Sequence, residues 1–323
     1  MAQRKLNKQQ QKRIRAKQEK TLKQIDDTRN QTGLVIQQHG KQAIVETLSG
    51  ELVDCKVRQN LGNIVCGDKV IWQTTLEDQG VILAVEERKN VLARPDFRHK
   101  PKPFVANIDQ IIIVTAVQPE LSQHLLDRYL VILETVQLPG LIIANKTDLL
   151  SNEGLSVIHE QLAVYQNIGY PVLYTSTKIA DGMNKLTTEL QNRRSILVGQ
   201  SGVGKSSIIK QLLPDLDVRV GKLTQANHGK HTTSSSVLYH LPCGGDIVDS
   251  PGIRDFSIWH IAAEDIESGF REFKDYKGQC RFNNCKHLNE PDCAIKQAVS
   301  AGKISGQRLA SYQQMLEEIA ANK

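Results

Sequence analysis

The stretch SILVGQSGVGKSSIIKQLL (195–213) decides the fold of the central part of this chain of 323 residues. A short strand, SILV, precedes GQSGVGKS (199–206), which matches the G-x-x-x-x-G-K-[ST] pattern of a phosphate-binding loop, and a helix-compatible run follows. The glycines let successive backbone N–H groups point at phosphate oxygens, and the start of the helix adds its positive dipole end. Because strand, loop and helix come in the required order, we interpret the stretch as a P-loop rather than a chance glycine-rich turn.

The P-loop predicts contacts to a nucleotide and to Mg²⁺. Lys205 should reach the β- and γ-phosphates, and the hydroxyl of Ser206 should ligate the metal. The residues that we expect to contact nucleotide in this loop are Gly199, Gln200, Ser201, Gly202, Val203, Gly204, Lys205, Ser206 and Ser207.

The stretch IIANKTDLL (142–150) predicts which base is bound. The carboxylate of Asp148 can accept hydrogen bonds from the N1–H and N2–H₂ groups of guanine, a donor pair that adenine lacks. Asn145 would contact the base and tie this loop to the P-loop, while the stem of Lys146 packs on the ring. With Thr147 these residues form the motif NKTD, directly after an apolar strand.

A second loop strengthens the prediction for guanine, because four matching residues alone are a weak signal. In YTSTKIADG (174–182), Ser176 and Thr177 follow the next strand along the chain and stand where a second base-contacting loop is expected.

Two further stretches complete the parts of a GTPase. In DIVDSPG (246–252) we expect Asp249 to hold Mg²⁺ through water and the N–H of Gly252 to sense the γ-phosphate. The polar stretch ANHGKHTTSSS (226–236) is typical of a mobile switch, and Thr233 is the best candidate to complete the Mg²⁺ shell.

The order of these parts is a circular permutation, because the base-reading loops come before the P-loop. Strands and helices alternate from Ile108 onward, which predicts a doubly wound α/β domain at 96–260. Domain termini commonly lie close together, so new chain ends leave such a site intact. The stretch DIVDSPG (246–252), the second switch of the GTPase, runs almost directly into the C-terminal segment. We therefore predict that movement at 249–254 changes the orientation of that segment.

The chain before this domain divides into a tail and a barrel. Residues 1–24 carry nine Lys/Arg against one Glu, and the Gln-rich tail 1–32 suits either contact with a phosphate backbone or simple solvation. Five short β-rich pieces at 33–95, punctuated by glycines, predict an OB-fold barrel. Such a barrel serves as a nucleic-acid binder or as a spacer. RPDFRHKPKP (94–103) is interpreted as a basic linker.

The C-terminal part, 261–323, predicts a small helical domain that binds zinc. Cys280, Cys285, His287 and Cys293 offer three thiolates and one imidazole within a short stretch, the donor set of a closed tetrahedral site. We expect one structural zinc per chain, whereas an iron–sulfur cluster is disfavoured by the single histidine. Helical spacing of apolar residues predicts one helix over 263–276 and another over 305–319.

Composition excludes several classes of protein. No window offers the ~18 uninterrupted apolar residues of a membrane helix, and the N-terminus lacks the apolar core of a secretory signal. Six cysteines in a chain of this size do not indicate a disulfide framework. We expect a cytoplasmic protein without membrane contact, and a monomer.

Taken together, these motifs resemble those of the ribosome small subunit-dependent GTPase A (RsgA) family. The resemblance rests on NKTD…GQSGVGKSS…HTTSSS…DSPG in permuted order, the barrel before them, KNVLARP (89–95) and the Cys/His cluster after them. It implies a GTPase that acts late in maturation of the small (30S) ribosomal subunit, binds the particle and its rRNA, and hydrolyses GTP to GDP and phosphate with stimulation by the subunit.

The catalytic residue is less evident. Many GTPases place a Gln after D-x-x-G to orient the attacking water, but here that position is Ile253. On the sequence alone, His231 is equally well explained as a catalytic group or as an ordinary loop histidine. The family resemblance favours catalysis. The expected catalytic set is His231, Lys205 and Thr233. The alternative to a GTPase is an RNA-binding assembly module with GTP as a structural or regulatory ligand, and the intact P-loop favours the enzyme.

Overall fold

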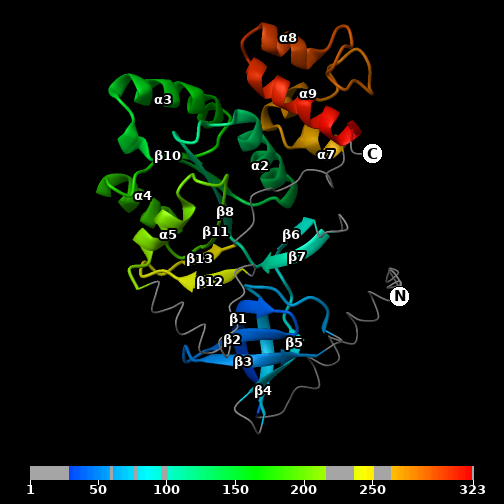
Figure 1. Cartoon of the computed structure of the whole chain (residues 1–323). Helices are drawn as coiled ribbons and strands as arrows, with labels where there is room; N and C mark the ends of the chain where they lie inside the picture. Colours follow the sequence, from blue (N-terminus) through cyan, green and yellow to red (C-terminus); the bar gives the residue numbers. More distant parts are fainter. Residues whose placement is uncertain are drawn as a thin grey trace. The chain divides into compact units, whose positions relative to one another are not determined.

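A computed structural model of the protein describes residues 29–58, 61–75, 79–95, 101–215, 236–250 and 263–321 (Figure 1). The chain divides into two compact units, each described here by itself. Within the described ranges, the first unit holds residues up to Val91, Pro103–Asn107 and 236–238. The second holds Leu92–Lys102, Ile108–Leu216 and Tyr239–Lys323.

The first unit is built around a closed five-stranded barrel, as predicted. Neighbouring strands β1–β2, β2–β3, β4–β5 and β1–β4 pair antiparallel, while β3 and β5 pair in parallel, so the ring closes in the order β1-β2-β3-β5-β4. The strands are β1 (Gln31–His39), β2 (Gln42–Thr47), β3 (Leu52–Val57), β4 (Lys69–Thr74) and β5 (Gly80–Val85). The OB-fold expected from the spacing of short strands is confirmed.

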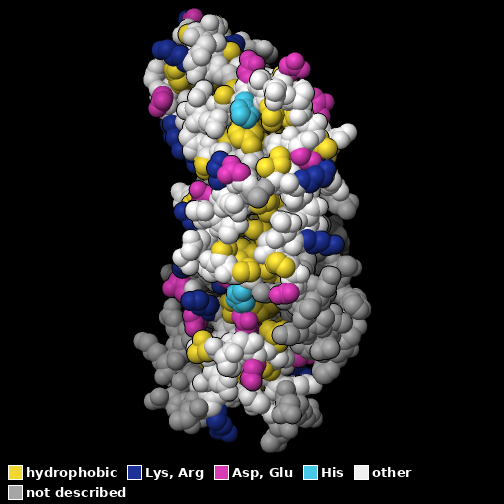
Figure 2. All heavy atoms as spheres, turned by 90° about the vertical axis from the view of Figure 1, so that its left-hand side faces the viewer, with side chains coloured by type: hydrophobic (Ala, Val, Ile, Leu, Met, Phe, Trp, Pro, Cys, Tyr) yellow, Lys and Arg dark blue, Asp and Glu magenta, His cyan; other side chains and the backbone are white. Residues whose placement is uncertain are grey.

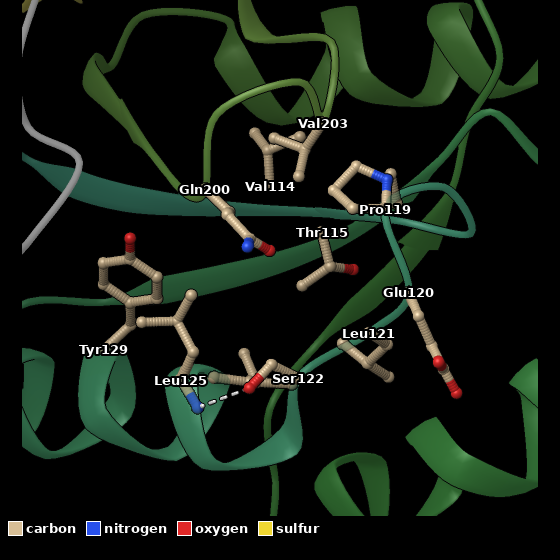
Figure 3. A pocket seen from close by; sticks show the side chains of 12 residues that line it. Val114, Thr115, Pro119, Glu120, Leu121, Ser122, Leu125, Tyr129, Gln200 and Val203 are labelled. Carbon is tan, nitrogen blue, oxygen red and sulfur yellow. Dashed lines mark hydrogen bonds between the residues drawn. The ribbon is translucent and has the colours of Figure 1, made fainter.

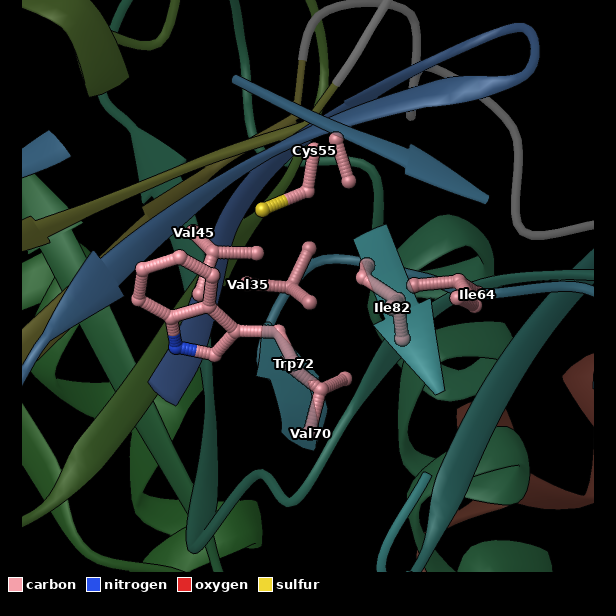
Figure 4. Close-up of a cluster of buried hydrophobic side chains, with 8 residues drawn as sticks. Val35, Val45, Cys55, Ile64, Val70, Trp72 and Ile82 are labelled. Carbon is pink, nitrogen blue, oxygen red and sulfur yellow. The ribbon is translucent and has the colours of Figure 1, made fainter. Parts of the chain in front are cut away.

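Alternate side chains of these strands fill the barrel (Figure 4). Val35, Val45 and Trp72 point inward from three strands and are almost completely buried. A Cβ on Gly80 would collide with the sulfur of Cys55 and with the Trp72 ring, so only glycine fits there. Burial raises the pKa of the Cys55 thiol to about 12, which keeps it protonated within the barrel.

One ion pair with a buried carboxylate lies beside the barrel. The guanidinium of Arg88 donates from Nε to Oδ1 of Asp68 at 2.7 Å and from Nη2 to Oδ2 at 2.8 Å. The same carboxylate accepts from the backbone N–H of Val65 at 2.8 Å. All of these bonds lie within the first unit, and they fix the turn before β4.

The predicted linker at 94–103 is partly wrong. Strands β6 (Val91–Pro95) and β7 (Pro101–Ala106) pair with each other as a two-stranded sheet. The two strands form because Leu92, Phe104 and Val105 are buried. Burial of these apolar side chains outweighs the charged and proline-rich composition of the stretch between them.

The second unit contains a mainly parallel sheet in the order β10-β9-β8-β11-β13-β12. The pairs β10–β9, β9–β8, β8–β11 and β11–β13 are parallel, and Figure 1 shows α2 on one side of the sheet with α4 and α5 on the other. The strands are β8 (Gln110–Ala116), β9 (Gly140–Asn145), β10 (Val172–Tyr174), β11 (Arg194–Val198), β12 (Val237–His240) and β13 (Asp246–Asp249). The predicted doubly wound sheet in permuted order is confirmed.

Helices alternate with these strands, as the predicted α/β pattern requires. They are α2 (Gln123–Val136), α3 (Asn152–Asn167), α4 (Ala180–Leu190) and α5 (Lys205–Leu212), with a short 3-10 turn, η2 (Thr147–Leu149). The hydroxyl of Ser122 caps α2 by accepting from the N–H of Leu125 at 3.3 Å. The helix ends at Gln137, whose φ of 55° is left-handed.

The C-terminal part of the second unit contains α7 (Ala263–Ser268), η4 (Arg271–Tyr276), α8 (Ala294–Ser300) and α9 (Gly306–Ala321). The single helix expected over 263–276 is wrong, because the chain changes direction at Gly269. A Cβ there would lie 2.9 Å from the Cα of Val131 in α2, so close packing decides the break. The predicted apolar face is nevertheless correct, since Ile266, Phe270 and Phe273 are buried.

The surface of the described residues is mixed in character. The face drawn in Figure 2 shows Lys and Arg interspersed with Asp and Glu and with small groups of apolar side chains. Within the described ranges, none of the helices combines the length and the hydropathy that a membrane crossing requires.

Candidate functional site

The P-loop connects β11 to α5, and at three of its positions the backbone conformation favours glycine. Gly199, Gly202 and Gly204 have φ values of 143°, 84° and 97°. A Cβ on Gly199 would collide with the carbonyl oxygen of Val114 in β8, and one on Gly204 with the side-chain nitrogen of Asn145. The glycines therefore allow the loop to pass directly over the ends of the neighbouring strands.

The predicted phosphate-binding lysine lies within the curve of this loop. Its Nζ donates to the carbonyl of Gly199 at 2.6 Å and to that of Gln200 at 2.7 Å. Ser206 and Ser207 are exposed in the first turn of α5, next to Lys205. The loop thus gathers an ammonium group, two hydroxyls and the start of a helix, which is a suitable environment for phosphate.

The base-reading loop after β9 is joined to the P-loop. The buried amide of Asn145 donates to the carbonyl of Val203 at 2.8 Å, and its oxygen accepts from Thr175 Oγ1 at 3.2 Å. Lys146 donates to the carbonyls of Gly202 and Gln118, at 2.6 Å and 2.7 Å. The predicted tie between the two loops is therefore present in the structure.

The carboxylate of Asp148 lies in the loop after β9 with two partners from the loop after β10. Ser176 donates to it at 2.6 Å and the ammonium of Lys178 lies 2.9 Å away. The Ser176 hydroxyl and then Lys178 lower the pKa of Asp148, so the group stays an acceptor. Thr147 donates to the carbonyl of Thr175, while Thr177 is half-buried between Ser176 and Lys178.

Lys178 was not anticipated as part of this site. The only signal for it was its place directly after Ser176 and Thr177 in the second base loop. Its pairing with Asp148 depends on β10 lying beside β9, which periodicity alone does not establish.

Asp249 ends β13, the strand beside the one that leads into the P-loop. Burial raises the pKa of its carboxyl, and the nearby ammonium of Lys205 partly opposes that rise. The sequence predicts that this carboxylate holds phosphate-bound Mg²⁺ through water. The predicted residues His231, Thr233 and Gly252, and also Ile253, lie outside the described residues.

The four predicted metal ligands come together in the C-terminal part. Their ligand atoms all lie within 4.8 Å of one another. His287 Nδ1 is 3.6 Å from the sulfurs of Cys280 and Cys285 and 3.2 Å from that of Cys293, and the sulfurs of Cys280 and Cys293 are 3.9 Å apart. A tetrahedral zinc with ordinary bond lengths would separate N and S by about 3.6 Å and two S atoms by about 3.8 Å, so the donors fit zinc.

Neighbouring groups hold these ligands in place. The Nε2 of His287 lies 3.7 Å from the Glu267 carboxylate, on the side of the ring opposite the thiols. The backbone N–H of Ala294 donates to the Cys280 sulfur at 3.4 Å, and Gln313 donates to the His287 carbonyl at 2.7 Å. Such outer contacts orient the ligands of a structural metal. Cys243 is not part of the cluster.

Comparisons with known proteins agree with this geometry. A family model described as RsgA GTPase matches residues 85–259. The chain is 44% identical over 338 residues to the small ribosomal subunit biogenesis GTPase RsgA of Haemophilus influenzae strain PittGG, covering 100% of this chain and 98% of the relative. It is 48% identical over 292 residues to the protein of the same name from Actinobacillus pleuropneumoniae serotype 5b, covering 89% and 85%.

Two solved structures have the same fold. The crystal structure of YjeQ from Thermotoga maritima matches with a TM-score of 0.73 and 34% identity over 90% of this chain and 99% of that chain. The structure of YloQ, described as a circularly permuted GTPase, matches with a TM-score of 0.73 and 28% identity over 93% and 98%. The matched length and the identity show that this chain belongs to the RsgA GTPase family.

Proposed function

We propose that the protein hydrolyses GTP and acts late in the maturation of the small (30S) ribosomal subunit, binding the particle and its rRNA. The observation that carries the proposal is the bond from Asn145 to Val203, which joins a guanine-reading loop to a phosphate-binding loop. Relatives that match over most of this chain are named for small ribosomal subunit biogenesis.

Guanine is the base that the site suits best. Asp148 accepts the guanine N1–H and N2–H₂ donors, and Ser176 and Lys178 keep its carboxylate ionised and oriented. Adenine presents an acceptor at N1 and offers that carboxylate no donor there. Thr177 and the stem of Lys146 contact the remaining faces of the base.

The phosphates lie along the P-loop. Its backbone N–H groups and Lys205 would bind the β- and γ-phosphates, while Ser206, Asp249 and Thr233 would hold Mg²⁺ directly or through water. The metal supplies neutralisation of the charge on the phosphates. The proposed cofactors are Mg²⁺ with GTP and one structural zinc, which Cys280, Cys285, His287 and Cys293 would hold.

Hydrolysis requires a water aligned with the γ-phosphate. The oxygen of that water bonds to the γ-phosphorus as the bond to the β–γ bridging oxygen breaks, which yields GDP and phosphate. His231 orients the water, since Ile253 has no polar side chain to do so, and His231 takes this role when the small subunit is bound. Turnover by the isolated protein is therefore slow.

Contact with rRNA involves more than one part of the chain. The nine basic residues of 1–24 and the barrel strands suit a phosphate backbone, and Lys277, Arg281 and Lys286 lie close in sequence to the metal ligands. The mixed charge on the face in Figure 2 makes that face a poor candidate for the contact. The protein acts as a monomer in the cytoplasm.

Co-sedimentation with isolated small subunits tests the proposal. The protein should sediment with small subunits in the presence of a non-hydrolysable GTP analogue, and much less with GDP or with large subunits. Equal sedimentation in all nucleotide states would favour the alternative, an RNA-binding assembly module with GTP as a structural ligand. Absence of binding to small subunits in every state would refute both.

A further inference from the structure

The C-terminal segment is fastened to helix α2 near both ends of that helix. In its first two turns, His124 contacts the carboxylate of Glu318 in α9 at 2.9 Å, and Arg128 lies 3.7 Å from the same group. In its last turn, Glu134 accepts from Arg271 Nε at 2.6 Å. These contacts join the metal-binding part of the chain to the helix that packs on β8.

A buried contact lies between these two. Arg308 of α9 and Asp127 of α2 are each 1% exposed, and Nη1 donates to Oδ1 at 2.6 Å. The same guanidinium donates to both carboxylate oxygens of Glu272 at 2.7 Å and 3.1 Å, and lies 4.3 Å from the centre of the Phe270 ring. Removing one partner would leave a buried charge without its counterpart, so this cluster fixes the position of α9 against α2.

The backbones also approach closely at this interface. Gly269, between α7 and η4, lies so near α2 that a Cβ would be 2.9 Å from the Cα and 2.9 Å from the Cγ1 of Val131. Both α7 and α9 contact α2. Packed groups at this separation cannot slide independently, so α2 and the C-terminal segment move together.

The start of α2 lies against the P-loop. Leu125 and Tyr129 of α2 face Gln200 and Val203 of the P-loop across one small cavity (Figure 3). Its volume is about 20 Å³, room for roughly one water molecule. The first turns of α2 are therefore nearly in contact with the loop that binds phosphate.

A lysine of the base-reading loop also bonds to the segment before α2. The ammonium of Lys146 donates to the carbonyl of Gln118 at 2.7 Å and to that of Gly202 in the P-loop at 2.6 Å. One side chain thus connects the base-reading loop, the P-loop and the entry to α2. A nucleotide that contacts Lys146 restrains all three.

We propose that α2 couples the nucleotide site to the zinc-binding segment, and that Arg308 is the positioning residue through which this coupling acts. Bound nucleotide holds the entry and first turns of α2, which in turn hold the Arg308–Asp127 contact and α9. Coupling between two binding processes is reciprocal, so loosening α9 weakens nucleotide binding by the same factor. The inference rests on the proposed function, because it takes a guanine nucleotide as the ligand. It needs no contribution from the second switch.

The variant Arg308→Lys tests the coupling, because lysine keeps the charge but cannot make the forked contact with two carboxylates. Arg88→Lys is the matched control: it breaks an equivalent two-bond contact with a buried aspartate, but in the barrel. GDP affinity and hydrogen exchange across 306–321, with and without GDP, are measured on the full-length, zinc-loaded proteins. Arg308→Lys should weaken GDP binding about fivefold or more, and Arg88→Lys should change it less than about twofold.

Hydrogen exchange measures the same coupling in the opposite direction, as the effect of GDP on α9. GDP should slow exchange in α9 of the parent protein, and this effect should shrink in Arg308→Lys. Unchanged GDP affinity in folded Arg308→Lys, with α9 exchange indifferent to GDP, would overturn the inference. A parent protein that does not bind GDP would instead refute the proposed function.

A second variant decides the question if Arg308→Lys does not fold. Glu318→Gln weakens the outer contact with His124 and Arg128 and leaves the buried pair in place. It should weaken GDP binding about twofold, because this contact is partly exposed to solvent and such pairs contribute little energy, and it should reduce the effect of GDP on α9 exchange. No change in either quantity would contradict the inference.

Discussion

The side chain of Asn145 donates a hydrogen bond of 2.8 Å to the backbone carbonyl of Val203, 58 positions along the chain. The bond is buried, and it joins the loop after β9 to the loop before α5. Gly204, next to Val203, leaves the space that the Asn145 amide occupies. Base and phosphate recognition are thus combined by one contact, although the chain order of the two loops is reversed relative to most GTPases.

Removal of this contact should weaken nucleotide binding. In Asn145→Ala the carbonyl of Val203 and the hydroxyl of Thr175 lose a buried partner, and each such loss costs about 1–3 kcal/mol. We expect GDP affinity to fall about 10- to 100-fold, measured with a fluorescent GDP analogue. Asn184→Ala, at an exposed position on α4, is the control and should bind as the parent does. Equal binding by both variants would contradict the role given to Asn145.

Replacement of Asp148 should change which base is bound. The carboxylate accepts two donors of guanine, whereas the amide of Asp148→Asn can donate to the carbonyl that xanthine carries at position 2. We expect this variant to lose at least about tenfold in GDP affinity, the effect of about 1.4 kcal/mol, and to gain affinity for the xanthine diphosphate. Competition binding with the two diphosphates measures this change in base preference. A parallel fall for both bases would show that Asp148 does not contact the base.

The buried carboxyl of Asp249 should lower the folding stability of the nucleotide-free protein at neutral pH. Burial raises its pKa, so its contribution to stability is favourable below the unfolded pKa of about 4 and is lost as pH rises through the folded value. At pH 7 the ionised group therefore destabilises the nucleotide-free protein. Asp249→Asn should raise the melting temperature of that form.

The same substitution should impair Mg²⁺-dependent binding of GTP. Loss of an outer-sphere carboxylate lowers metal-assisted affinity by about 10- to 100-fold, which titration of GTP with and without Mg²⁺ measures. A melting temperature below that of the parent, or an unchanged effect of Mg²⁺, would contradict the assignment of Asp249.

Zinc should be required for the stability of the C-terminal segment. Cys285→Ser removes one of four ligands, so we expect the purified variant to contain far less than one zinc per chain and to lose protection from proteolysis within 263–321. Cys243→Ser is the control, because this cysteine lies outside the cluster, and it should retain one zinc. Equal zinc content in the two variants would refute the proposed ligand set.

Local motifs explain why much of the site was predictable from sequence. The phosphate loop needs glycine wherever the backbone turns left-handed or passes over a strand, so its chemistry is visible in the residue types at 199–206. Likewise the four metal ligands lie within one short stretch, and their spacing alone suffices to bring them together.

Contacts between distant segments were not predictable in the same way. Lys178 reaches Asp148 only because β10 lies beside β9, and Arg308 reaches Asp127 across 181 positions. Asp127 does interrupt an otherwise apolar face of α2, and a charge in that position indicates a buried partner without identifying it. The break at Gly269 depends on Val131 in another helix, which periodicity within 263–276 cannot reveal.

The turnover of GTP by the purified protein alone, with isolated small ribosomal subunits and with large subunits tests the central claim most directly. We predict slow turnover alone, strong stimulation by small subunits only, loss of that stimulation in Lys205→Ala, and a decrease of about 100-fold in the stimulated rate of His231→Ala. Equal slow turnover under all three conditions would contradict the account, and the protein would then be an RNA-binding module that uses GTP as a structural ligand.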